Sequence, residues 1–450
     1  MNDFPLLNGL AARLARPGRF TLAEARVPQS LLGGSTPAFA EIDRDGSVLV
    51  DIMIEGSRIA AVTPSSSGRN DDAISLDGRH VWPLLVDVHA HLDKGHTMGR
   101  APESGGTHPG ARAATTADRL AHWNKHDLLR RMEFALSTAD AHGVAAIRTH
   151  LDSHDGQAEI TWNAFAQMKE RWKDRITLQA AGLVPLDAYR EEYGTRLADI
   201  IAGHGGLLGG VTRASGGTHG SGLDDIDALL DRMFVLAGER GLDIDLHVDE
   251  AAQADALPHV ARATIRHGYE GRVTCGHCCS LALLSDDVLR DRIALIADAG
   301  ISIITLPTVN MYLQDREPGR TPRWRGVTPV KELRAAGITV ATAGDNCRDP
   351  FFAYGDHDML DTWRQSVRIL HLDHPYGDAA ALAAPGPARI MGIEAGIIGV
   401  GRPADLMILE AWSIDQVIAR PHADRLILRR GVFANRTLPS YSLLGGQITQ

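Results

Sequence analysis

Eight short apolar runs recur along the chain and alternate with amphipathic segments of helix length. This alternation is typical of βα units around a parallel sheet. Eight repeats favour a closed (β/α)8 barrel of the TIM type over an open doubly wound sheet, and such a barrel carries its chemistry at the carboxyl ends of its strands. The runs lie near residues 81, 144, 176, 206, 242, 272, 301 and 338.

Both ends of the chain have a β-rich pattern. From about Phe20 to Val81, short alternating stretches are separated by glycine and aspartate, and similar stretches return at Ala404–Glu410 and Arg425–Phe433. We therefore predict a small flanking β-domain that is built from both ends of the chain. The predicted boundaries assign residues 1–81 and 396–450 to this domain and residues 82–395 to the barrel.

The composition narrows the choice of partner. A formal net charge of -10 would repel phosphate backbones and anionic lipid surfaces, which argues against nucleic acid and membrane and leaves a small molecule. Four cysteines in 450 residues make no disulfide framework. The sequence shows no apolar stretch of about 18 residues and no recognisable export signal. We expect a cytoplasmic homo-oligomer.

Polar side chains stand at or just after the ends of several runs. His89 and His91 lie two positions apart on a strand and therefore project from the same face. Such a pair can arise by chance in a chain with 20 histidines. His247 and Asp345 would complete a set of three nitrogens and one carboxylate, which suits Zn2+ or Fe2+ and leaves a position for water. The residues at these ends are His89, His91, Gln179, His247, His277 and Asp345.

Several motifs resemble those of the cytosine deaminase branch of the amidohydrolase superfamily. The most specific are HAHLD (His89–Asp93), HVDE (His247–Glu250), CGH (Cys275–His277) and GDN (Gly344–Asn346). Further matches in order and spacing are RTHLD (Arg148–Asp152), VNMYLQDR (Val309–Arg316) and RGVTPVKEL (Arg325–Leu333). The resemblance extends roughly over residues 20–435.

The resemblance implies one divalent metal ion, Zn2+ or Fe2+, bound by His89, His91, His247 and Asp345. The remaining coordination position would hold the attacking hydroxide, because a divalent cation lowers the pKa of bound water to about 7. Asp345 would accept the proton. Binuclear members of the superfamily usually carry a bridging lysine at the end of the fourth strand, but the corresponding run, GLLGGVTR, contains none. One metal ion is therefore expected.

The resemblance also assigns roles to residues around the metal. Glu250 would be the proton shuttle, which protonates a ring nitrogen and then the departing amino group; the alternative is a solvated loop carboxylate. His277 would hydrogen-bond the hydroxide or the developing tetrahedral oxygen. Gln179 would bind an amide-like edge of a pyrimidine or triazine ring, although a position at the surface or at the edge of the core stays open for it.

Lys94 and Asn346 depart from the cytosine deaminase pattern, in which an uncharged residue and a second aspartate are usual. Both resemble instead the N-isopropylammelide amidohydrolase of triazine breakdown, which lacks the carboxylate found here at Glu250. We expect Lys94 and Asn346 to bind substrate. Lys94 would contact a ring oxygen or an anionic ring, and a salt bridge to Asp93 or to a loop carboxylate is the alternative.

The predicted function is that of a metal-dependent hydrolytic deaminase of a small amino-substituted nitrogen heterocycle, with cytosine as the best single named substrate. One alternative is hydrolysis of an N-alkylamino or cyclic-amide bond in a triazine-type ring. Another is a catalytically inactive interaction protein. The segment between His96 and His126 is too long for an ordinary βα loop, and we interpret it as a lid or an oligomer contact.

Overall fold

The computed structural model describes residues 11, 14–15, 17–33, 41–65, 73–217, 223–420, 425–434 and 437–445. By compactness the chain divides into two units. The first comprises Met1–Val86, Ala139–Ala146 and Asp358–Leu438, and the second comprises Asp87–Thr138, Ile147–His357 and Pro439–Gln450. The predicted domain boundaries, after residues 81 and 395, stay a prediction, and parts of the predicted β-domain, such as residues 1–10 and 446–450, lie outside the described residues.

The first unit contains a four-stranded sheet in the order β3-β2-β1-β4. Its strands are β1 (Arg19–Pro28), β2 (Ser47–Glu55), β3 (Arg58–Pro64) and β4 (Ala73–Ser75). Val48, Val50, Ile52 and Ile54 of β2 are all buried. Because alternate side chains of a strand share a face, this spacing of two places the four apolar side chains on the covered side of the sheet.

A second sheet of this unit joins strands from both halves of the chain, in the order β16-β15-β14-β5. Its strands are β5 (Val81–Pro83), β14 (Leu406–Leu409), β15 (Arg425–Arg429) and β16 (Val432–Ala434). Since β5 pairs antiparallel with β14, the β-rich ends of the chain do come together. The unit also holds the helices α11 (Met359–Ile369), α12 (Tyr376–Ala380), α13 (Pro385–Met391) and α14 (Ile414–Ala419).

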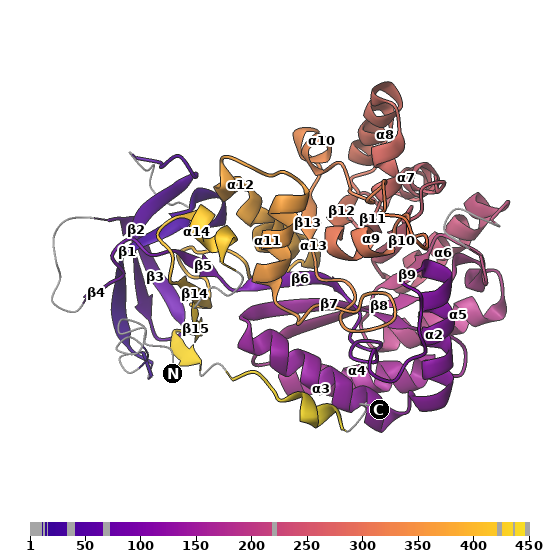
Figure 1. The fold of residues 1–450 in the computed structure, drawn as a ribbon, viewed down its shortest axis with the longest axis horizontal. Coiled ribbons are helices and arrows are strands. Elements are labelled where there is room, and N and C mark those ends of the chain that lie inside the picture. Colours follow the sequence, from indigo (N-terminus) through magenta and orange to yellow (C-terminus); the bar gives the residue numbers. More distant parts are fainter. Residues whose placement is uncertain are drawn as a thin grey trace. The chain divides into compact units, whose positions relative to one another are not determined.

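Eight strands carry the barrel, in two sheets (Figure 1). A three-stranded sheet contains β6 (Leu85–Ala90), β7 (Val144–Asp152) and β8 (Thr177–Leu183). A parallel five-stranded sheet contains β9 (Leu208–Val211), β10 (Ile244–Val248), β11 (Val273–His277), β12 (Ser302–Thr305) and β13 (Val340–Thr342). The run near residue 81 is therefore two strands: β5 ends at Pro83, which has no amide hydrogen to donate, and β6 belongs to the barrel.

Isolated parallel bridges connect the two sheets at both edges. Ala181 pairs with Leu207 and Pro185 with Val211 on one side, and Ala90 pairs with Asp345 on the other. Every residue of β6, β9, β10 and β11 is buried, as expected for parallel strands covered on both faces. The architecture is that of the predicted (β/α)8 barrel.

The barrel strands are followed by helices that the sequence explains locally. α6 ends at Gly241, whose φ of 67° is the left-handed conformation that favours glycine at a helix end. The segment between His96 and His126 contains α2, which begins after Thr107, and the Thr107 side chain accepts a hydrogen bond from the Gly110 amide at 3.2 Å. None of the described helices is long and apolar enough to cross a membrane. The helices are α2 (His108–His122), α3 (Lys125–Ala141), α4 (Ala158–Trp172), α5 (Glu192–Gly203), α6 (Ile226–Arg240), α7 (Leu257–Arg266), α8 (Asp286–Asp298), α9 (Pro307–Leu313) and α10 (Val330–Ala335).

Candidate active site

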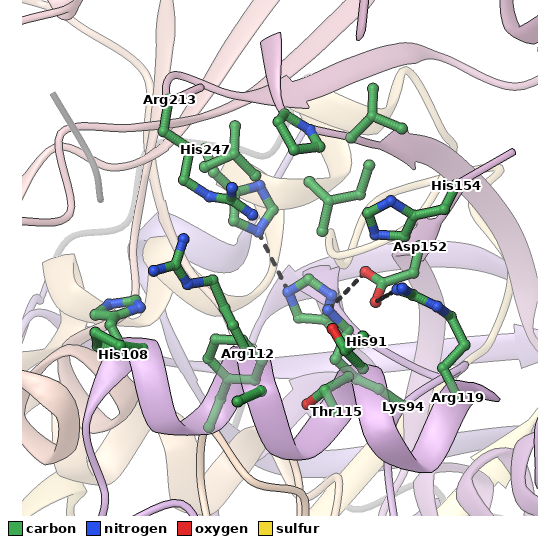
Figure 2. Close-up of a pocket in the computed structure, with 18 of the residues that line it drawn as sticks. His91, Lys94, His108, Arg112, Thr115, Arg119, Asp152, His154, Arg213 and His247 are labelled. Carbon is green, nitrogen blue, oxygen red and sulfur yellow. Dashed lines mark hydrogen bonds and ion pairs between the residues drawn. The ribbon is translucent and has the colours of Figure 1, made fainter. Parts of the chain in front are cut away.

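A cavity of about 950 Å³ lies at the carboxyl ends of the barrel strands, where this fold places its chemistry. His91 and Asp345, which follow β6 and β13, line it together with His247 of β10 and His277 of β11. One face of α2 lines it as well (Figure 2). The long segment after the first barrel strand therefore forms a wall of the cavity, and its interpretation as a lid or an oligomer contact stays a prediction.

The four predicted metal ligands lie together beneath this cavity. Nε2 of His91 is 3.2 Å from Oδ1 of Asp345, and Nε2 of His89 is 3.6 Å from the same oxygen. Nε2 of His247 is 3.3 Å from Nε2 of His91. All four side chains are buried. Three strands thus bring three ring nitrogens and one carboxylate oxygen to a single point.

The donor set fits a divalent cation. Both carboxylate oxygens of Asp345 and both ring nitrogens of His89 are buried without a hydrogen bond, which is costly unless another partner satisfies them. Burial, and then the charges of neighbouring groups, holds the pKa values of His89, His91 and His247 well below the ordinary histidine value. Neutral imidazole is the form that ligates metals. A set of three imidazoles and one carboxylate suits zinc or iron.

A further imidazole, that of His150 on β7, belongs to this cluster. Ligand atoms of His89, His91, His150 and His247 lie within 4.8 Å of one another. Nε2 of His150 is also 3.1 Å from Oδ1 of Asp245, whose other oxygen accepts a hydrogen bond from Arg148. Sequence reasoning assigned His150 no role, although the RTHLD motif marked its position.

The backbone packs closely against the side chains of the proposed metal ligands. A Cβ atom at Gly276 would lie 2.8 Å from Cε1 and 3.0 Å from Nδ1 of His89, so the histidine ring can occupy its place only beside a glycine. Asp345 and His277 adopt φ angles of 61° and 70°, a region that residues other than glycine rarely enter and that is concentrated at functional sites. The amide of Asp345 donates to the carbonyl oxygen of His89 at 2.7 Å, which holds the strained residue in place.

Asn310 of α9 contacts both Glu250 and His277. Nδ2 of Asn310 donates to Oε1 of Glu250 at 3.2 Å and lies 3.0 Å from Nδ1 of His277. Since a carboxylate only accepts, the amide nitrogen must face Glu250; His277 then accepts at Nδ1 and carries its ring proton on Nε2. Nε2 of His108 on α2 lies 2.9 Å from Oε1 of Glu250. Asn310 and His108 were not identified from the sequence, although Asn310 lies within the VNMYLQDR motif.

Lys94 and Asn346 both line the cavity, and each has a carboxylate partner. Nζ of Lys94 donates to Oδ1 of Asp152 at 2.8 Å, and both groups are buried. Burial opposes the charge on Lys94, but the carboxylates of Asp152 and Asp93 outweigh it and raise the lysine pKa. Nδ2 of Asn346 donates to Oδ2 of Asp349 at 2.7 Å. The salt-bridge alternative for Lys94 is therefore present in the structure, with Asp152 as the partner.

Two predicted site residues, His89 and Gln179, do not line the cavity. His89 lies in the ligand cluster, whereas Gln179 lies in neither place. It is the third residue of β8, a strand that continues to Leu183, and Leu183 lines the cavity instead. Oε1 of Gln179 accepts hydrogen bonds from Nε and Nη2 of Arg148 at 3.1 and 3.0 Å. The expected position at the end of a strand was wrong, because the β-rich pattern continues for several residues beyond this glutamine.

Basic residues that the sequence analysis did not identify also line the cavity. Arg112 and Arg119 come from α2, Arg213 from the loop after β9, and His154 from the loop after β7. Nη1 of Arg119 lies 3.8 Å from Oδ2 of Asp152. The sequence does show that the segment between His96 and His126 is unusually long, and this length could have drawn attention to the residues of α2. It does not show which of their side chains point into the cavity.

Comparisons with known proteins agree with this geometry. A model described as the amidohydrolase family matches residues 72–232 and 225–450. A pterin deaminase of Rhizobium rhizogenes (strain K84) is 45% identical over 428 residues, which cover 94% of this chain and 95% of that protein. An N-isopropylammelide isopropyl amidohydrolase of Pseudomonas sp. (strain ADP) is 28% identical over 81% of this chain and 88% of that protein.

Solved structures give the same fold. A 5-methylcytosine deaminase from Klebsiella pneumoniae, liganded with 5-fluorocytosine, superposes with a TM-score of 0.77. The match covers 94% of this chain and 98% of that chain at 24% identity. This likeness supports the barrel architecture, and the resemblance to the superfamily that the motifs indicated is confirmed.

Proposed function

Since the chain belongs to the amidohydrolase family, as a hydrolase of carbon–nitrogen bonds in heterocycles, we propose that it removes the amino group of a pterin-type ring by hydrolysis. We choose a pterin ring because the chain is 45% identical to a pterin deaminase over 94% of its length. The cavity of about 950 Å³ is compatible with a two-ring substrate. The pyrimidine half of a pterin has the same kind of amino-substituted, oxo-bearing ring as cytosine, which was named from the sequence.

The proposed metal site consists of His89, His91, His247 and Asp345, which would hold one Zn2+ or Fe2+ ion. When bound, such a cation acts as a Lewis acid and lowers the pKa of water to about 7, which supplies a nucleophile at neutral pH. Asp345 would accept a proton at its carboxylate. His150, whose ring centroid lies 4.0 Å from that of His89, would be held in its orientation by Asp245.

Glu250 would move the protons that deamination requires. It lines the cavity and is 4% exposed, so a ring held there would be shielded from bulk water. It would protonate a ring nitrogen, which makes the adjacent carbon more electrophilic. It would then take the proton from the hydroxyl group of the adduct and deliver it to the amino group, which leaves as ammonia while the ring carbonyl forms. His277, with its proton on Nε2, would donate to the oxygen that develops negative charge at the attacked carbon.

A second candidate is hydrolysis of an N-alkylamino bond in a triazine ring. It is favoured by the 28% identity to the isopropylammelide enzyme and by Lys94 and Asn346, which resemble that enzyme at two positions. Both candidates use the same ligand set and differ in the leaving group. Ammonia marks the first and an alkylamine the second.

The test is a substrate panel on the metal-replete enzyme. The panel contains pterin, cytosine and N-isopropylammelide, and kcat/KM is measured from the disappearance of the ring and the amine released. We expect the highest kcat/KM with pterin and ammonia as the amine. A higher kcat/KM with N-isopropylammelide, together with isopropylamine release, would replace the proposal by the second candidate.

We further propose a homo-oligomer that resides in the cytoplasm. All four cysteines are free and buried, which fits a reducing compartment. Light scattering after gel filtration measures the oligomer mass, and a mass of 48.5 kDa, that of one chain, would contradict this proposal.

A further inference from the structure

Two arginines of the cavity wall lie close to each other. Arg112 of α2 and Arg213 of the loop after β9 both line the cavity. Among the residues that the structure describes, neither takes part in an ion pair. Figure 2 shows their side chains reaching from opposite sides toward the same part of the cavity, beside His247. The segment 218–222, which is outside the described residues, contains no aspartate or glutamate.

Their hydrogen bonds leave most of each guanidinium available. Arg112 donates to the carbonyl oxygen of Gly217, and its Nε is buried without a hydrogen bond. Nη1 of Arg213 donates to the carbonyl oxygen of Ala214 at 3.1 Å. A guanidinium has about five N–H donors in a planar fork, so both side chains retain donors that can bind a ligand.

Without a bound anion, the surroundings of Arg112 and Arg213 disfavour the charges of both side chains in the folded protein. Burial, and then the nearby Arg112 charge, lowers the pKa of Arg213 to about 10, and burial lowers the pKa of Arg112. Several other arginines of the barrel unit are paired: Arg100, for example, binds both Asp118 and Asp127. The carboxylates of Asp152, Asp187 and Glu250 offset part of this effect on Arg213. None of the described carboxylates forms an ion pair with either arginine, and an anion between the two would relieve the remaining repulsion.

We propose that Arg112 and Arg213 bind an anionic substituent, such as a carboxylate, carried by the heterocycle on the side away from the reacting amino group. This inference rests on the proposed function, and it adds an acidic substrate class to it. Guanidinium groups suit this task, because their N–H forks match the two oxygens of a carboxylate. A cavity of about 950 Å³ is in the range of sites for drug-sized ligands and has room for a ring and its substituent.

The experiment compares pterin with 6-carboxypterin and 7-carboxypterin, which differ only in the charge and its position. Binding is followed by the fluorescence of the ring, and turnover by ammonia release. The variants are Arg112→Met and Arg213→Met, with Arg112→Lys and Arg213→Lys to restore the charge. Arg290→Met on α8 is the matched control, since Arg290 is exposed, pairs with Asp287 and does not line the cavity.

We expect wild-type protein to bind one of the carboxypterins about tenfold or more tightly than pterin, as for a charge-assisted hydrogen bond. Each methionine variant should reduce this preference by about tenfold to a hundredfold. The lysine variants should recover part of the preference for the carboxypterin, and the control Arg290→Met should keep that preference. A direct contact should also keep most of the preference in 0.5 M salt, where long-range steering is screened.

Equal affinity of wild-type protein for pterin and both carboxypterins would overturn the inference. So would an unchanged preference in both methionine variants. Failure of the proposed function is a separate result: if no pterin releases ammonia but the carboxypterin preference depends on Arg112 and Arg213, the anion site stands and the reaction assignment falls.

Discussion

Nε2 of His91 lies 3.2 Å from Oδ1 of Asp345, and the amide of Asp345 donates to the carbonyl oxygen of His89 at 2.7 Å. The first and last strands of the barrel therefore meet at the residues that carry the proposed metal site. Closure of the barrel and assembly of the ligand set depend on the same contacts, so a change in the cluster should affect metal content and stability together.

Removal of a ligand should weaken metal binding and abolish turnover. Asp345→Ala or His247→Ala takes away one of the four proposed ligands, and no other group supplies the nucleophile. Metal content by mass spectrometry and ammonia release are the measurements. Asp287→Ala, at an exposed position of α8, should retain both. Full turnover by either cluster variant would refute the ligand assignment.

Glu250→Gln should lose proton transfer while the metal stays bound. The amide keeps the size of the side chain and its acceptor for Asn310, but it has no proton to exchange at neutral pH. We expect kcat to fall by about two to four orders of magnitude, the range typical of general acid–base groups. Glu239→Gln on α6, where the side chain is exposed, is the control and should behave like wild-type protein. A loss below tenfold would reassign Glu250 to a structural role.

Gly276→Ala tests the close approach of β11 to His89. The new methyl group would lie 2.8 Å from the imidazole, and overpacking of this kind typically costs about 1–3 kcal/mol. We expect weaker metal binding and a lower Tm. Gly203→Ala, at the end of α5, meets no atom within 4 Å and is the matched control. If the two variants had the same metal affinity and Tm, the packing argument would be wrong.

Lys94→Met should lower stability, because it leaves the Asp152 carboxylate buried without its main partner. Removal of one member of a buried pair costs about 3–5 kcal/mol. Lys173→Met, which breaks an exposed pair with Glu170, should cost less than about 1 kcal/mol. Asp152→Asn added to Lys94→Met should restore part of the Tm. If stability is unchanged and only anionic rings lose kcat/KM, Lys94 binds ring charge as first expected from the sequence.

The pH dependence of this pair follows from its pKa shifts. Burial disfavours both charges, but the attraction outweighs it, so the pKa of Asp152 is lowered and that of Lys94 is raised. The stabilisation is then lost only as pH falls through the lowered pKa of Asp152 or rises beyond the ordinary lysine value of about 10.4. Burial raises the pKa of the neighbouring Asp93 to about 7, and the Lys94 charge holds it below the value it would have without the lysine. The difference in unfolding free energy between wild-type protein and Lys94→Met should therefore be largest near pH 9 and shrink as the pH falls through about 7, as denaturant titrations can measure.

The common location of residues at strand ends could be predicted from the sequence. Each of these residues follows an apolar run, and parallel strands all end on the same side of the barrel. His89, His91, His247 and Asp345 were expected on one edge for this reason, and the structure brings them together. Gln179 was misplaced because the apolar run continues beyond it, so the glutamine lies inside β8 and not at its end. The exact end of a strand depends on how the strand pairs with its neighbours, and it can shift by a few residues. The sequence pattern alone does not contain this pairing.

The basic wall of the cavity was beyond sequence reasoning for another reason. Arg112 and Arg119 lie on a helix inside an insertion, and an amphipathic helix can place its polar face on solvent as well as on a cavity. Only the packing of α2 over the barrel determines that they point inward. Asn310 and His108 likewise become site residues through contacts with Glu250 that join segments distant in the sequence.

The most direct test of hydrolytic deamination is the fate of solvent oxygen. Metal-replete enzyme is incubated with pterin in water enriched in oxygen-18, and the ring product is analysed by mass spectrometry while ammonia is counted. We predict one ammonia per ring consumed and one labelled oxygen at the carbon that carried the amino group. A ring that loses its amino group without the label, or a pterin that releases no ammonia at all, would contradict the account.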